Sequence, residues 1–415
     1  MKWATSCPAL GTRETAVSVA DRASVKISFH DLAPYLTWRV PSENLLLVAD
    51  SEKNADMLYA TGMFVPDPFI YLRLRGRHYV VMSDLEFDRA KKQAPHCRVL
   101  SLSAYAEKLK GKGARYAPLA EVVREILREK KVRSVTVPPS FPHGLALRLE
   151  KLNVRVKVSH GAIFPQREFK DPDEIRKVKA AVAMTEVGMS EALQALRRSR
   201  IDKTGRLVYR NTKLTSEKLQ AIIGSAIFSA GGLASNTIVA GGNQGTDPHE
   251  RGHGPLKAHQ PIIIDIFPRS EKTGYFGDLT RTVVRGRASD AIKKIYASVL
   301  KAQSVCLAKI RAGVPLATAH QAVVDHFESD GYKTGRRNGH MEGFFHGTGH
   351  GIGLEIHEAP SIGRDSKSKF RPGQVVTVEP GLYYPGIGGV RLEDDVLVTK
   401  GRPRNLTRCE KELEV

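Results

Sequence analysis

The sequence predicts two domains, an α/β domain followed by an α+β domain. Before about residue 160, short apolar runs alternate with segments of helical spacing, which is typical of an α/β domain. After Gly335 the chain is rich in glycine and in short strand-like runs. Between these parts lies the polar, proline-containing stretch PQREFKDPDE, residues 165–174. We therefore expect the domains to span residues 1–168 and 169–415.

The composition is that of an ordinary globular protein. Of the 415 residues, 41% are hydrophobic and 26% are charged. No apolar run approaches the roughly 20 residues that cross a bilayer, and the first residues lack the apolar stretch of a secretory signal. The four cysteines lie far apart, without the spacing of a thiolate zinc site. We therefore expect a cytoplasmic protein without membrane association.

The net charge of +20 by itself suggests a polyanionic partner. The basic residues are, however, spread through the chain, and clusters such as residues 127–133 lie in helix-like segments, where a solvated face is the usual explanation. The sequence has no zinc-finger spacing, RNA-binding aromatic motif or basic arm. Nucleic acid is therefore not expected as the main partner.

The first domain should contain strands and helices in alternation. Its apolar runs predict strands at 45–48, 69–74, 78–82, 134–137 and 154–158. The segments between them predict helices at 51–61, 84–93, 117–130 and 142–152. No polar cluster in this domain is typical of catalysis, so we interpret it as a scaffold or oligomerisation domain.

The second domain should begin with a strongly capped helix. Asp171 can cap the first turn, and Pro172 suits the first helical position. Asp173 and Glu174 favour the positive end of the helix dipole. Further helices are expected from Thr215 or Ser216 to Gly231, at 289–311 and at 316–330. These helices would flank a sheet that carries the polar residues.

The first polar motif lies in PIIIDIFPRSEKTGYFGDLTRTVV, two strand-like runs joined by a turn-rich segment. Asp265 interrupts one run, and a carboxylate inside an isoleucine-rich strand is costly unless something neutralises it. Asp278 opens the other run, where strand alternation places it on one face with Thr280 and Thr282. Their hydroxyls can support this carboxylate. A buried aspartate bonded only to backbone N–H groups is the structural alternative.

The second motif, FFHGTGHGIGLEIHEAP, carries three histidines in a glycine-rich segment, which makes a helix improbable. Read as a strand, it places His346, Thr348 and His350 on one face. His357 would then lie on the opposite face, so a turn or bulge must intervene if it serves the same site as His350. A single histidine is more often structural, but three together favour a functional site.

The third motif is VVTVEPGLYYPGIGGVRLEDDVLVT, in which Glu379 ends one apolar run and Glu393 lies in another. Arg391 and Glu393 share a strand face, so the guanidinium can orient a carboxylate or a bridging oxygen. For Asp394 and Asp395, which follow, solvated or structural roles compete with chemical ones.

Together these motifs offer four carboxylates and one imidazole. Two divalent cations would cancel the four negative charges of the carboxylates. Without metal, such a cluster would repel itself and its pKa values would rise. The oxygen-rich set favours hard or borderline ions, with Mn²⁺ as the first choice and Co²⁺, Fe²⁺ or Zn²⁺ as alternatives. A hydroxide that bridges two such ions is the nucleophile of a two-metal hydrolase.

The ordered set IDxF…GDLTRT, HGTGHGIGLEIHE, TVEPGLYYP and GGVRLEDD, within about 172–405, resembles the pita-bread metallopeptidases. That family includes methionine aminopeptidase, prolidase and aminopeptidase P. The resemblance implies a creatinase-like N-terminal domain, a pita-bread catalytic domain and a homo-oligomer, either a dimer or a tetramer. It implies metal ligation by Asp265, Asp278, His350, Glu379 and Glu393. It also implies substrate contacts from His357 and from an upstream histidine, for which His249 is our choice and His253 the second.

We expect an Xaa-Pro aminopeptidase that acts on peptides with proline at the second position. Glu379 would pass the proton of the nucleophile to the leaving nitrogen, while His357 and His249 stabilise the oxyanion or hold the peptide. His346 and Arg391 would contact the substrate or orient the ligands. The residues proposed as walls of an apolar proline pocket are Phe344, Phe345 and Tyr383.

Two alternatives differ in what the chain binds. A prolidase would recognise a nearby carboxyl terminus, for which Arg364 is a weak candidate because a loop arginine is usually just exposed. A pita-bread protein without activity would bind protein or RNA, but such proteins have lost the metal ligands and this sequence has all five. The connection IFPRSEKTGYFG is longer than is usual in the family and would reshape one rim of the site.

Overall fold

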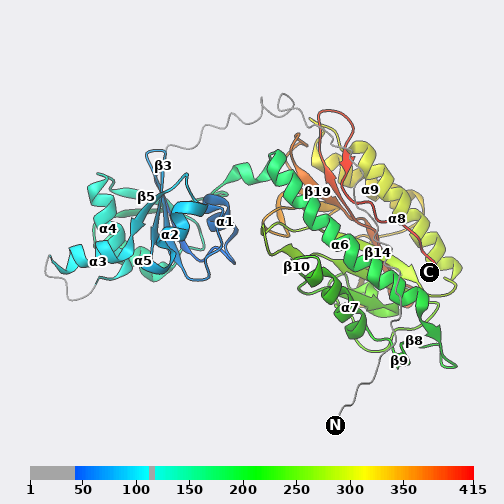
Figure 1. Ribbon diagram of the computed structural model, residues 1–415. Helices are drawn as coiled ribbons and strands as arrows, with labels where there is room; N and C mark the ends of the chain where they lie inside the picture. The colour runs from blue at the N-terminus through cyan, green and yellow to red at the C-terminus, as the bar shows by residue number, and fades with distance from the viewer. Residues whose placement is uncertain (1–42, 112–116) are drawn as a thin grey trace, which may run out of the picture.

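The computed structural model describes residues 43–111 and 117–415, which form an N-terminal α/β domain and a C-terminal α+β domain (Figure 1). The predicted fold class is therefore confirmed. Residues 1–42 and 112–116, including the start of the predicted first domain, lie outside the described residues. Within the described residues, no helix is both long and apolar enough to cross a membrane.

The N-terminal domain is built on a mixed six-stranded sheet with the order β4-β3-β2-β1-β5-β6. Its strands are β1 Leu45–Ala49, β2 Phe69–Leu74, β3 Arg77–Met82, β4 Arg98–Ser101, β5 Ser134–Val137 and β6 Arg155–Val158. Its helices are α1 Ala55–Thr61, α2 Asp84–Gln93, α3 Leu102–Lys110, α4 Leu119–Glu129 and α5 His143–Lys151. The sequence predicted all of these elements except β4 and α3.

Helices cover both faces of this sheet, which explains its continuous apolar strands. Leu46 and Leu72 pack in one cluster with Val122 and Ile126 of α4. Leu47 points to the opposite face and joins a second cluster with residues of α1 and α2. The domain therefore has two apolar cores, one on each side of the sheet.

The second domain begins with α6, Pro172–Arg198, which starts as the sequence predicted. The Asp171 side chain accepts hydrogen bonds from the backbone N–H groups of Asp173 and Glu174, both at 2.8 Å. In return, Glu174 Oε2 accepts one from the Asp171 N–H at 3.0 Å. This reciprocal capping fixes the helix end nearest the first domain.

Strands of two sheets carry the three polar motifs. One sheet has the order β11-β12-β14, with β11 Ile238–Gly241, β12 Pro261–Ile266 and β14 Leu279–Val284. The other has the order β18-β17-β19-β22-β23, with β17 Gly349–Gly351, β18 Glu358–Ile362, β19 Val375–Val378, β22 Asp394–Leu397 and β23 Arg404–Asn405. The hairpins are β15 Gly335–Arg337 with β16 His340–Glu342, and β20 Gly381–Tyr384 with β21 Gly388–Arg391.

Helices flank these strands, with α6 and α7 (green) and α8 and α9 (yellow) on the outside in Figure 1. α6 and α7, Ser216–Ser229, pack in one apolar cluster with β11, β12 and β14. α8, Asp290–Lys309, and α9, Leu316–Ser329, pack in another with β19 and β22. The short strands are β7 Arg200–Ile201, β8 Leu207–Tyr209, β9 Thr212–Lys213, β10 Gly232–Leu233 and β13 Arg269–Ser270. The polar motifs are thus held on strands whose outer faces are covered.

Charged side chains join the two domains near the predicted boundary. Arg167 donates to Asp56 of α1 and to Glu358 of β18, both at 2.7 Å. The buried Lys170 also binds Glu358, at 2.6 Å. The linker includes the 3-10 helix Pro165–Glu168. It is therefore bound through Arg167 and Lys170 to Glu358, the residue after His357. The boundary between residues 168 and 169 stays a prediction.

Candidate functional site

The two aspartates of the first motif enter a cavity of about 590 Å³. Asp265 lies on β12, opposite Thr280 of β14, and Asp278 lies just before β14. Both side chains are buried, with 8% and 4% of each residue exposed. One oxygen of each, Oδ1, has no hydrogen-bond partner among the described residues. Each therefore retains a free acceptor in a place where an unpaired charge is costly.

His350 reaches the same cavity from β17. Its Nε2 lies 3.8 Å from Asp278 Oδ2 and 3.4 Å from Glu379 Oε1. Its backbone N–H donates to Thr377 Oγ1 of β19 at 3.0 Å. Gly349 permits this close approach of strands, because a Cβ there would overlap the carbonyl oxygen of Thr377.

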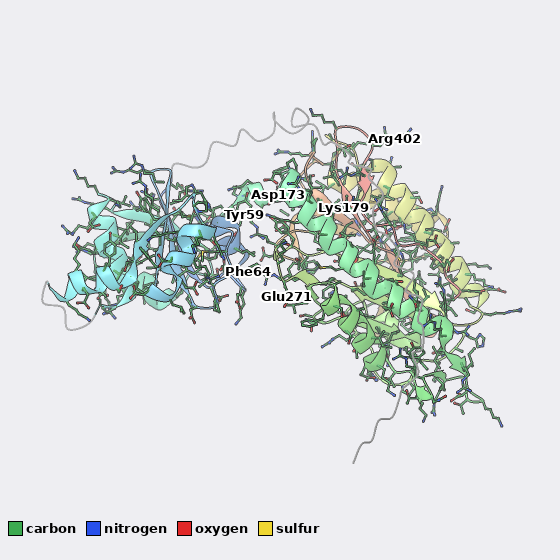
Figure 2. All side chains as sticks on the ribbon, viewed as in Figure 1. Tyr59, Phe64, Asp173, Lys179, Glu271 and Arg402 are labelled. Carbon is green, nitrogen blue, oxygen red and sulfur yellow. The ribbon has the colours of Figure 1, made fainter. Side chains whose placement is uncertain are left out.

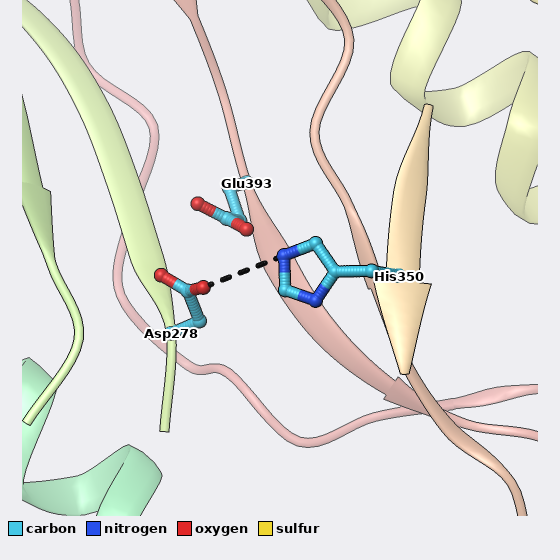
Figure 3. A group of neighbouring side chains, drawn as sticks. All are labelled: Asp278, His350 and Glu393. Carbon is cyan, nitrogen blue, oxygen red and sulfur yellow. Dashed lines mark ion pairs between the residues drawn. The ribbon is translucent and has the colours of Figure 1, made fainter. Parts of the chain in front are cut away.

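The two glutamates complete the set. Glu379 follows β19, and its N–H donates to the carbonyl of Thr348 at 2.8 Å. Glu393 precedes β22, and its N–H donates to the carbonyl of Thr280 at 3.1 Å. Candidate ligand atoms of Asp278, His350 and Glu393 all lie within 4.8 Å of one another (Figure 3). The cavity is lined by all five predicted ligands, Asp265, Asp278, His350, Glu379 and Glu393.

The buried carboxylates of this cluster lie close together, so a bound cation would stabilise their ionised forms. Burial, followed by the neighbouring carboxylates of Glu393 and Asp265, raises the pKa of Asp278 well above its usual value. Burial and the charge of Glu379 raise the pKa of Glu393 in the same way. Burial raises the pKa of Glu379 to about 7, although Arg391 opposes this shift. Carboxylate oxygens with one imidazole form a donor set that fits hard or borderline divalent cations.

Arg391, which lies on β21, orients the candidate metal ligand Asp265, which lies on β12. Its Nη2 donates to Asp265 Oδ2 at 2.7 Å, and both residues are buried. The Thr280 side chain likewise binds a residue of another segment: its hydroxyl donates to Glu393 Oε2 at 2.6 Å. The expectation that Thr280 supports Asp278 is therefore wrong. The two side chains share a strand face, but the hydroxyl is directed to the neighbouring β22 segment.

The predicted irregularity between His350 and His357 is present. The register of β17 and β18 shifts between His350 and Gly351. As a result the rings of His350 and His357 lie 4.2 Å apart, nearly perpendicular at 87°. Burial, followed by the charge of His357, lowers the pKa of His350 to about 4. His350 is therefore neutral near pH 7, which is the form that binds metal.

Of the two upstream histidines, His249 lines the cavity and His253 does not. The His249 N–H is held by Asp247 Oδ1 at 3.0 Å. The His253 N–H binds Gln244 Oε1, and its exposed side chain belongs to the outer surface of the loop. The geometry thus favours His249 as the upstream histidine of the site.

His346 is connected to the acidic cluster through Tyr383. His346 Nε2 lies 2.9 Å from the Tyr383 hydroxyl, which accepts from Arg391 Nη1 at 3.0 Å. Burial and the charge of Arg391 lower the pKa of His346 to about 3. A neutral His346, Tyr383 and Arg391 therefore form a continuous hydrogen-bonded path to Asp265.

The three aromatic walls predicted for the proline pocket are distributed differently. Phe345 lines the cavity. Tyr383 is fully buried and is not part of the lining, so its assignment as a wall is wrong. Phe344 lines an adjacent cavity of about 850 Å³, which shares Phe345 and His346 with the first and also contains the exposed Arg364.

Asp394 and Asp395 are fully buried, so a solvated role is wrong for both. Asp394 accepts from Arg281 at 2.8 Å and from Lys411 at 2.6 Å. Asp395 Oδ2 accepts from the Asp278 N–H at 3.0 Å, and burial raises its pKa to about 8. Sequence reasoning missed Arg281, although a charged residue within the apolar β14 run was a signal for a buried partner.

Comparison with known proteins gives a family and a fold. Residues 176–400 match the family described as Metallopeptidase family M24. The chain is 39% identical over 178 residues to the Uncharacterized peptidase YqhT of Bacillus subtilis (strain 168). That alignment covers 42% of this chain and about half, 47%, of the relative.

Two solved structures are similar over nearly their whole length. The Xaa-Pro dipeptidase from Bacillus anthracis is 25% identical, with a TM-score of 0.75, over 90% of this chain and 95% of that chain. The X-Pro aminopeptidase from Thermotoga maritima MSB8 is 23% identical, with a TM-score of 0.76, over 91% of this chain and 98% of that chain. The similarity to the Thermotoga maritima structure shows that the two chains share a fold.

Proposed function

Since this chain belongs to metallopeptidase family M24, we propose that it is a two-metal Xaa-Pro aminopeptidase. It removes the N-terminal residue from peptides that have proline at the second position. The observation that carries the proposal is the convergence of four carboxylates and one imidazole on a single cavity, where Oδ1 of Asp265 and of Asp278 has no hydrogen-bond partner among the described residues.

The residues that would hold two divalent ions, Mn²⁺ first, are Asp265, Asp278, His350, Glu379 and Glu393. The raised pKa values of Asp278, Glu379 and Glu393 and the neutral imidazole of His350 support this assignment. When bound, the ions supply Lewis-acid activation of the attacking water and of the scissile carbonyl. Arg391 orients Asp265 and Thr280 orients Glu393, so the ligands are held in place before metal arrives.

Glu379 is proposed as the proton carrier. Burial raises the pKa of this carboxyl, although Arg391 opposes the shift, and a positioned carboxylate can act as a general base. It would accept the proton of the attacking water and deliver it to the nitrogen of proline as the bond breaks. Its N–H bond to Thr348 and its contact with His350 fix its place in the cavity.

His249 and His357 are proposed to bind the substrate and the developing oxyanion. Both line the cavity, and they come from different segments, one after β11 and one before β18. Donors fixed by the fold stabilise charge that develops in the transition state. The apolar side chains of the lining include Ile238, Phe267, Phe345 and Ile356. An apolar lining suits the compact ring of proline, whose peptide nitrogen brings no N–H to satisfy.

An Xaa-Pro dipeptidase is the second candidate, supported by the similar Bacillus anthracis structure. We favour the aminopeptidase because the adjacent cavity of about 850 Å³ offers room for a peptide that continues beyond proline. Arg364, the candidate for binding a carboxyl terminus, lines that second cavity and is exposed.

The experiment compares Gly-Pro with Gly-Pro-Yaa as substrates of the metal-loaded, full-length protein. Faster release of glycine from the tripeptide supports the aminopeptidase. Cleavage of the dipeptide alone would select the dipeptidase instead. Metal binding without hydrolysis of either peptide would support the third alternative, a pita-bread protein that only binds.

A further inference from the structure

A separate cavity of about 440 Å³ lies between the two domains. The N-terminal domain contributes Tyr59, Tyr71 and Arg73, and the catalytic domain contributes Glu174, Thr273 and Tyr275. Figure 2 shows Tyr59 and Phe64 on the edge of the first domain that faces Asp173 and Glu271 of the second. None of the five candidate metal ligands lines this cavity.

Arg73 of β2 is buried here, and none of the described residues forms an ion pair with it. It is 4% exposed and has no hydrogen bond or ion pair within the described part of the chain. The other buried cations of the described residues all bind a carboxylate: Lys170 binds Glu358 at 2.6 Å, Arg281 binds Asp394 at 2.8 Å and Arg391 binds Asp265 at 2.7 Å. Arg73 is therefore the exception among them.

The surroundings of Arg73 do not offset this cost. A buried, unpaired cation destabilises a protein by several kcal/mol. The ring of Phe164, 5.9 Å from the guanidinium carbon, offers only a cation–π contact, which contributes about 0.5–2 kcal/mol. Strand pairing sets His78 directly opposite Arg73, but the His78 Nδ1 is engaged by the Tyr71 hydroxyl at 2.7 Å.

The acids on the opposite wall are already engaged. Asp173 binds Lys177 at 2.7 Å and Arg176 at 2.9 Å. Asp171 caps α6, and Glu174 accepts from the Tyr275 hydroxyl at 2.7 Å. No carboxylate of these walls is therefore left to neutralise Arg73, so the negative charge must come from outside the described chain.

We propose that this cavity binds a small organic anion whose carboxylate or phosphate group pairs with Arg73. The flat guanidinium presents two parallel donors that match either oxyanion. The rings of Tyr59 and Phe164, 5.3 Å apart, provide an apolar surface for the rest of the ligand. A volume of about 440 Å³ lies in the range of small-molecule sites. The exposed Lys272 also lines the cavity and adds positive charge.

The ligand would also contact the long connection between the two candidate metal-binding aspartates. Thr273 and Tyr275 of this connection line the cavity, and Asp278 follows three residues after Tyr275. Arg269 of the same connection donates to the carbonyl of Glu52 in the first domain. Part of the connection thus packs against the N-terminal domain, whereas Phe267 lines the metal-site cavity. A bound anion would hold both domains to the segment that leads to Asp278.

The test is the binding of inorganic phosphate and of acetate to the full-length protein by calorimetry at constant ionic strength. Arg73→Met removes the charge and keeps an apolar side chain of similar length, while Arg77→Met removes an exposed arginine of β3 as the matched control. Phosphate held elsewhere, including at bound metals, contributes equally to all three proteins. We expect Arg73→Met to lose one binding site or at least tenfold in affinity, and Arg77→Met to bind like wild type.

Equal stoichiometry and affinity for wild type and Arg73→Met would overturn the proposal, as would a wild type that binds neither anion. Binding of phosphate alone or of acetate alone supports it and identifies the oxyanion. If Arg73→Met does not fold, wild-type crystals soaked in selenate provide the second test. An anomalous peak within hydrogen-bond distance of the Arg73 guanidinium supports the site, and an empty cavity contradicts it.

Discussion

Arg391 donates a 2.7 Å hydrogen bond to Asp265 from a strand 126 residues further along the chain, and both side chains are buried. The bond occupies Oδ2 of the aspartate and leaves Oδ1 without a partner among the described residues. One carboxylate is thus oriented by the protein and still has an oxygen for a metal. The same arginine binds the Tyr383 hydroxyl, which places His346 in the same network.

Replacing Arg391 with methionine should weaken metal binding. The substitution removes the group that orients Asp265 and leaves that carboxylate buried without its cation. Loss of such an outer partner typically costs about 10–100-fold in metal affinity or activity. Metal affinity is measured by titration, with Arg402→Met, an exposed arginine, as the control. If Arg391→Met bound metal as tightly as the control, the orienting role would be wrong.

Glu379→Gln and His249→Ala should separate proton transfer from substrate stabilisation. Glutamine keeps an oxygen ligand but no basic carboxylate, so kcat should fall by about 10²–10⁴. His249→Ala should retain its metals and lose about 10²–10³ in kcat if the imidazole donates to the oxyanion. Both variants are assayed with an Xaa-Pro-Yaa peptide alongside their metal content. A near-normal kcat for Glu379→Gln with its metals bound would exclude Glu379 as the proton carrier.

His346→Gln should reduce activity without changing the acid side of the pH profile. Burial and Arg391 lower the pKa of His346 to about 3, below its ordinary value of 6.5. The folded protein therefore holds this imidazole neutral throughout an assay between about pH 5 and pH 9. kcat/KM is measured across that range for wild type and variant. Disappearance of an acid limb in His346→Gln would show that this histidine does titrate during catalysis.

Glu358→Gln should destabilise the protein much more than Glu355→Gln. The Glu358 side chain is 8% exposed and binds Lys170, whose side chain is 1% exposed, so its loss leaves a buried lysine unpaired. Such a change costs about 3–5 kcal/mol. Glu355 also binds Arg167, but its side chain is 56% exposed, and exposed pairs contribute about 0–1 kcal/mol. Urea denaturation of both variants compares them, and equal losses would contradict this view of the interdomain ion pairs.

Local signals explain why much of the fold could be predicted. The capping box at Asp171, the apolar runs and the glycine-rich segments report directly on nearby backbone structure. β4 was missed because Arg98–Ser101 is a short, partly exposed strand, and α3 because it buries no residue. The order of the six strands depends on pairing between distant segments, which no local pattern specifies.

At the site, too, local sequence signals identified some features, whereas contacts between distant segments could not be predicted. Each predicted ligand stands out as a polar residue in an apolar or glycine-rich run, and the structure gathers all five around one cavity. The bonds from Arg391 to Asp265 and from Thr280 to Glu393 cross between segments more than 100 residues apart. Arg73 in the apolar β2 run signals a buried charge, as Arg281 does in β14, but the sequence does not reveal whether a carboxylate lies opposite.

The most direct measurement follows the N-terminal residue released from an Xaa-Pro-Yaa tripeptide, together with the metal content per chain. It is made on the full-length protein as purified, after chelation and after Mn²⁺ is restored. The account predicts about two divalent ions per chain, loss of hydrolysis with the metals and recovery with Mn²⁺. Undiminished hydrolysis by metal-free protein, or no cleavage of any Xaa-Pro bond by metal-loaded protein, would contradict it.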